Sequence, residues 1–146
     1  MLSTTTRSTR QERFAIRKLV WVGPLTIVMV ALVNLMVRTL AVSFFGVASS
    51  FVYLQTPFVI GSTVVFLALA LLAFVLAGRL SSQPVRVFRI VAAVALFVSF
   101  LNPLMLLAGL FPAVGMNLHI FWTMIVMHCV SALITVSLLT MLAIEQ

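Results

Sequence analysis

Four long apolar runs constrain the fold of this chain more than any other feature of its sequence. They cover about residues 19–45, 57–77, 87–107 and 118–144. Each run can cross a hydrocarbon core of about 30 Å, which takes about 20 helical residues. Backbone groups in lipid must bond to one another, so a spanning run is a helix unless strands close into a barrel. Because the stretch VVFLALALLAFVLA lacks the alternation of a barrel strand, the sequence predicts an all-α, integral membrane four-helix bundle.

Composition supports a membrane protein and argues against two other classes. The 146 residues are 64% hydrophobic and 8% charged, whereas a soluble domain carries about 25% charged residues. The high isoelectric point, near 11.8, arises because only Glu12 and Glu145 oppose nine Lys and Arg residues. These basic residues flank apolar runs rather than alternate with exposed aromatics, so we expect no nucleic-acid partner.

The chain divides into a short tail and one membrane domain. Residues 1–18 form a basic tail, which we expect to be cytoplasmic and disordered at its start. Residues 19–146 form the four-transmembrane-helix domain. Pro103 lies near the far end of the third run and lacks an amide proton, so it should kink or end that helix. Cleavage as a signal peptide is disfavoured, since the first apolar run is too long.

The basic residues predict the orientation of the bundle. Of the nine Lys and Arg residues, only Arg38 falls on the far side, and the others lie in the tail or around the turn after the second run. Cytoplasmic loops are enriched in Lys and Arg, so both termini should be cytoplasmic. Basic residues other than Lys18 are all arginine, which suggests a bacterial chain in the cytoplasmic (plasma) membrane. The tail should also contact anionic lipids.

Polar side chains of the apolar runs predict a pocket. Asn34 and Arg38 are one helical turn apart and share a face. By their distance from the cytoplasmic ends, Asn34 and Asn102 lie at the same depth, while Gln55 and His128 lie in the outer half or near the midplane. These five residues are the candidates for an outward-facing polar pocket. The alternative is that Arg38 extends to the outer headgroups.

Few side chains of the sequence are candidates for metal binding or catalysis. Met124, Met127 and His128 share one helix face and are soft ligands suited to Cu(I). However, methionine commonly fills gaps in apolar bundles, and no second cluster completes a site, so we expect neither a metal nor a cofactor. The sequence has no Asp, and its two Glu residues lie near the chain ends. No catalytic group of side chains is visible, which favours a non-enzymatic protein.

Several stretches follow one another in a recognisable order. They are WVGPL with ALVNLMVR, then PFVIGSTVV, QPVRVFRIVAAVALFVSFLNPL and MIVMHCVSALITVSLLT. In this order they resemble a family of small bacterial four-span membrane proteins that carry a domain of unknown function. The most specific marks are the motif from Pro84 to Arg89 and the pair Met127–His128. The resemblance implies a membrane location and four helices, and it implies no activity.

The function predicted from the sequence is that of a binding or accessory subunit with an outward-facing polar pocket. The alternative is a protomer of an oligomeric transporter or channel, because four short helices make too narrow a bundle for a pore. Partners would be the lipid bilayer and either further copies of the chain or another membrane protein.

Overall fold

The structure is a computed structural model that describes residues 13–14, 16–142 and 144–145. It confirms the all-α class predicted from the sequence. The elements, in chain order, are β1 (Arg13–Phe14), α1 (Ile16–Phe45), the 3₁₀ turn η1 (Val52–Leu54), α2 (Thr56–Leu80), α3 (Pro84–Ser99), α4 (Leu101–Leu107), α5 (Leu118–Leu142) and β2 (Ile144–Glu145). The two-residue strands β1 and β2 pair antiparallel, which joins the described ends of the chain.

Four helical segments are long and apolar enough to cross a membrane. They are α1, α2, the combined α3 and α4, and α5. The break between α3 and α4 falls at Phe100, whose φ of −69° and ψ of −20° stay in the right-handed helical region. Because Pro103 has no amide proton, the carbonyl of Ser99 has no helical donor four residues later. The interruption predicted at Asn102–Pro103 therefore takes effect just before these two residues.

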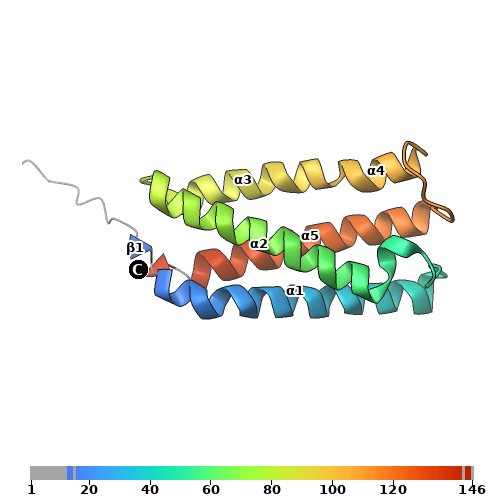
Figure 1. Ribbon diagram of the computed structural model, residues 1–146, viewed down its shortest axis with the longest axis horizontal. Helices are drawn as coiled ribbons and strands as arrows, with labels where there is room; N and C mark the ends of the chain where they lie inside the picture. Colours follow the sequence, from blue (N-terminus) through green and yellow to red (C-terminus); the bar gives the residue numbers. More distant parts are fainter. Residues whose placement is uncertain (1–12, 15, 143, 146) are drawn as a thin grey trace, which may run out of the picture.

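The helices form a ring of antiparallel neighbours. Helix α1 packs against α2 and α5, and α3 packs against α2 and α5. Figure 1 shows α2 running from α3 at one end of the bundle towards α1 at the other end. The described chain ends and the α2–α3 turn lie at the same end (Figure 1). This basic end carries Lys18, Arg79, Arg86 and Arg89.

Most of the buried apolar side chains gather in two separate clusters. One cluster joins α1, α2, α3 and α5 near the basic end, and it consists of Val22, Phe74, Ala77, Phe88 and Leu139. The other lies around the α1–α2 connection and the start of α5, and it consists of Ala41, Val47, Phe51, Leu54, Leu106, Ile120 and Met124. The middle of the bundle lies between these clusters, and it is there that the bundle is hollow.

Gly23 lies where α1 packs closely on α2. A Cβ atom built on Gly23 would lie 3.2 Å from Cδ1 of Leu71, which is tighter than ordinary van der Waals contact. The missing side chain lets the two helices approach each other, as small residues commonly do between membrane helices.

Candidate functional site

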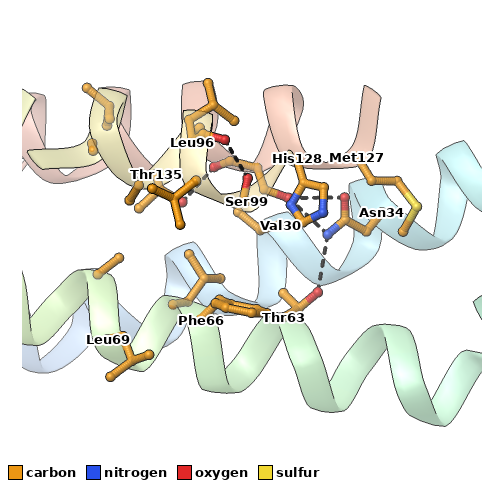
Figure 2. Close-up of a pocket in the computed structure, with 18 of the residues that line it drawn as sticks. Val30, Asn34, Thr63, Phe66, Leu69, Leu96, Ser99, Met127, His128 and Thr135 are labelled. Atoms are coloured by element: carbon orange, nitrogen blue, oxygen red, sulfur yellow. Dashed lines mark hydrogen bonds between the residues drawn. The ribbon is translucent and has the colours of Figure 1, made fainter. Parts of the chain in front are cut away.

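A cavity of about 510 Å³ lies between α1, α2, α3 and α5. Its volume falls within the range of about 300–1,000 Å³ that is usual for small-molecule sites. Figure 2 shows α2 on one side of this space, α3 and α5 on the other, and α1 behind it. Most of the lining is apolar, and the polar side chains that interrupt it are Asn34, Tyr53, Thr63, Ser99, His128, Ser131 and Thr135.

Asn34 is the polar centre of the cavity wall, because its amide links three helices. Only 5% of this α1 residue is exposed. Its Nδ2 donates to Oγ1 of Thr63 on α2 over 3.2 Å and to Oγ of Ser131 on α5 over 3.0 Å. The Ser131 hydroxyl also lies 3.2 Å from Asn34 Oδ1, to which it can donate. These contacts, drawn in Figure 2, fix the Asn34 amide and hold α1, α2 and α5 in register.

Two further hydroxyl groups of the lining use their protons within their own helices. Thr135 donates to the carbonyl of Ser131 over 2.7 Å, and Ser99 donates to the carbonyl of Leu96 over 2.7 Å. Such bonds back to the preceding turn are common for Ser and Thr in helices. Since each proton is engaged, the oxygen atoms of Thr135 and Ser99 offer the cavity acceptor capacity only.

His128, like Tyr53, is a lining residue whose polar side-chain atoms have no hydrogen-bond partner among the described residues. Its half-buried ring meets Phe100 edge to face, with 6.5 Å between ring centroids and 74° between ring planes. Within the described part of the chain, no group hydrogen-bonds to this imidazole. A neutral imidazole carries one donor and one acceptor nitrogen. His128 therefore offers both to whatever occupies the cavity, beside Asn34 in Figure 2.

Arg38 lies outside the cavity lining. Its Nε donates to the backbone carbonyl of Leu54, and the side chain is half-buried. Leu54 itself lines the cavity. Arg38 therefore fastens the connection between α1 and α2 to the last turns of α1, and it supports the wall without facing the space.

The two other predicted pocket residues also lie away from the cavity. Gln55 and Asn102 are exposed and do not line it. The amide of Gln55 donates to the carbonyl of Ser50 over 3.5 Å. Of the five predicted residues, the structure thus brings Asn34 and His128 to one cavity and leaves Arg38, Gln55 and Asn102 outside it.

The sequence prediction did not include five polar residues of the lining, namely Tyr53, Thr63, Ser99, Ser131 and Thr135. One signal was available for two of them. Ser131 follows His128 by three residues, and Thr135 follows Ser131 by four. Such spacing places side chains on the same helix face.

The three soft side chains considered as metal ligands all line the cavity. Met124, Met127 and His128 come from α5 alone. In the described ranges, the structure has no group of three or more His, Cys, Asp or Glu residues that could hold a metal ion. The thioethers of Met124 and Met127 here form part of the apolar wall next to the imidazole.

Comparisons with protein-family models, curated proteins and solved structures found no match to this chain. The resemblance to small bacterial four-span proteins therefore stays a prediction.

Proposed function

We propose that this chain is a multi-pass membrane protein that binds a small molecule in the cavity between its helices. It acts as a binding or accessory subunit and carries out no chemistry of its own. The support comes from two features, an apolar outer surface and a cavity whose polar groups are concentrated on one wall.

The outer surface supports insertion into a bilayer. Large apolar side chains are exposed on every long helix, for example Met36 at 57%, Phe66 at 60%, Phe97 at 72% and Leu133 at 68%. Soluble monomers rarely expose contiguous apolar surface of this extent, whereas a bilayer solvates it. The basic end would face the cytoplasm of a bacterial cell, with both termini on that side of the plasma membrane.

The observation that carries the proposal is the pairing of the Asn34 network with the unengaged imidazole of His128. Polar groups inside a membrane bundle are costly and usually functional. Asn34 donates to Thr63 and Ser131, and Ser131 can donate back to Asn34, which is an adequate structural role. His128 lines the same cavity without a hydrogen-bonding partner in the described chain, and a bound molecule would supply that partner.

Two adjacent alanines of α3 allow a matched test of binding. Ala92 lines the cavity, whereas Ala93 is exposed and lies outside the lining. The protein would be purified in native lipid patches and extracted with organic solvent, and small molecules would be quantified by mass spectrometry. We expect wild type and Ala93→Phe to retain a molecule at close to one per chain, and Ala92→Phe to lose it because the phenyl ring fills the cavity.

Equal retention by the two variants, or no retained molecule in wild type, would contradict the binding proposal. The same preparations address the alternative of an oligomeric transporter or channel. Reconstituted vesicles that show ion flux, abolished by Ala92→Phe and unaffected by Ala93→Phe, would replace the binding role with a transport role.

A further inference from the structure

We infer that the molecule bound in this cavity is an uncharged amphiphile, with an apolar tail between α2 and α3 and an oxygen-bearing end group at His128. This inference rests on the proposed binding function and specifies its ligand class. Three properties of the cavity lead to it: the position of its mouth, the charge of its lining and the free donors on its wall.

The mouth of the cavity lies between α2 and α3. Phe66 and Leu69 on α2, and Val91 and Val98 on α3, all line the cavity and are 45–60% exposed. A side chain that both lines a cavity and is exposed lies at its opening. Figure 1 shows α2 and α3 close together at their connecting turn and farther apart towards α4. In a bilayer such an opening faces acyl chains, so its natural occupant is a lipid-soluble tail.

The lining excludes a charged end group. The described residues that line the cavity include no Asp, Glu, Lys or Arg, and the half-buried Arg38 instead binds the Leu54 carbonyl outside the lining. A carboxylate or phosphate moved into such a space would lose its hydration without gaining a counter-charge, which is strongly unfavourable. A neutral end group avoids this cost.

The free hydrogen-bonding capacity of the wall specifies an oxygen acceptor on the ligand. Both amide protons of Asn34 are directed at Thr63 and Ser131. The lining donors without an acceptor among the described residues are the N–H of His128 and the hydroxyl groups of Tyr53 and Thr63. Ser99 and Thr135 offer acceptor oxygens. A carbonyl oxygen would accept from His128, and a hydroxyl group could in addition donate to one of these oxygens. Quinones and long-chain alcohols have this chemistry.

The experiment compares probes with the same tail and different end groups. The protein is placed in phosphatidylcholine nanodiscs, and apparent affinities come from the dependence of the thermal unfolding midpoint on probe concentration. The probes are a decyl-substituted benzoquinone, decylbenzene, decanoate and a benzoquinone without a tail. We expect the decyl quinone to bind about tenfold more tightly than decylbenzene, since one added hydrogen bond is worth about that ratio. Decanoate and the tailless quinone should bind far more weakly.

Two histidines of α5 provide the variant and its control. His128→Phe should remove most of the tenfold preference for the quinone and leave the affinity for decylbenzene unchanged. His119 is exposed and lies outside the cavity lining, so His119→Phe should leave both affinities unchanged. The comparison is made between probes on the same variant, so a general loss of stability does not affect it.

The failures of this inference and of the proposed function are distinguishable. Equal binding of decyl quinone and decylbenzene to wild type would overturn the assignment of an oxygen-bearing end. Tightest binding of decanoate would overturn the assignment of a neutral ligand. In either case the loss of a retained molecule in Ala92→Phe would still support binding in the cavity. If Ala92→Phe and Ala93→Phe behave alike, the proposed function itself fails.

Discussion

Asn34 illustrates how one amide can stabilise the middle of an apolar bundle. Its Nδ2 reaches hydroxyl oxygens on two other helices, at 3.2 Å and 3.0 Å. In lipid, no water competes for these bonds, although the net stabilisation of each interhelical bond averages only about 0.6 kcal/mol, with a maximum near 1.7 kcal/mol. Their main contribution is to fix the rotation of α2 and α5 about their axes relative to α1.

The amide network predicts that replacing Asn34 destabilises the protein more than replacing Asn102. Asn34→Leu removes both interhelical bonds and leaves the hydroxyl groups of Thr63 and Ser131 without this partner, so it should lower the free energy of unfolding by about 1–3 kcal/mol. The measurement is equilibrium unfolding in mixed micelles.

The matched control for this substitution is Asn102→Leu. Asn102 is exposed, and we expect its replacement to change the free energy of unfolding by less than about 0.5 kcal/mol. An equal effect of the two substitutions would show that the Asn34 network does not stabilise the bundle.

The site was only partly predictable from the sequence. The sequence indicates how far along its helix a residue lies, but it does not indicate whether the side chain points into the bundle or away from it. Counting 1.5 Å per residue placed Asn34 and Asn102 at one depth, yet the structure buries the first and exposes the second. Direction around a helix is normally read from an apolar face opposite a polar one. The spans here are apolar on all sides, so that signal is missing, and the contribution of Thr63 and Ser131 could not be deduced.

The elements themselves were predictable because their signals are local. Apolar length sets the four spans, and proline chemistry sets the break between α3 and α4. The chain stays helical through Pro24 of α1, which a helix in a bilayer would tolerate when neighbouring groups compensate. Close contacts between helices were less predictable, because they depend on which residues meet after packing.

The contact at Gly23 gives a prediction at the scale of elements. Gly23→Val should push α1 away from Leu71 on α2 and lower the free energy of unfolding by about 1–3 kcal/mol, the usual cost of overpacking. Gly61 is the control, since a Cβ atom built there meets no heavy atom within 4 Å.

Gly61→Val should therefore change stability by less than about 0.5 kcal/mol. Thermal unfolding of both variants in the same lipid nanodiscs makes the comparison. A larger loss at Gly61 than at Gly23 would contradict the close approach of α1 and α2.

At the scale of the whole molecule, the cavity exists because the helices pack closely at the two ends of the bundle and less closely in its middle. One cluster of buried side chains closes the basic end and another closes the opposite end. Between them, α2 crosses from α3 towards α1 (Figure 1), which leaves an unfilled space bordered by all the long helices. No local sequence pattern encodes such a space, because it results from the relative tilt of helices that are far apart in the chain.

The membrane crossing of the four helices is the premise of the whole account, and the labelling of two serines tests it most directly. Ser49 lies in the α1–α2 connection and Ser82 in the α2–α3 turn, and both are exposed. Each would be replaced by cysteine in a chain whose native cysteine is removed by Cys129→Ala. A membrane-impermeant maleimide would then be applied to intact bacterial cells and to inside-out vesicles.

We expect Ser49→Cys to react in intact cells and Ser82→Cys to react only in inside-out vesicles. This result would place the basic end in the cytoplasm and the opposite end outside. Reaction of both cysteines from the same side of the membrane would contradict four crossings, and with them a cavity that opens to lipid.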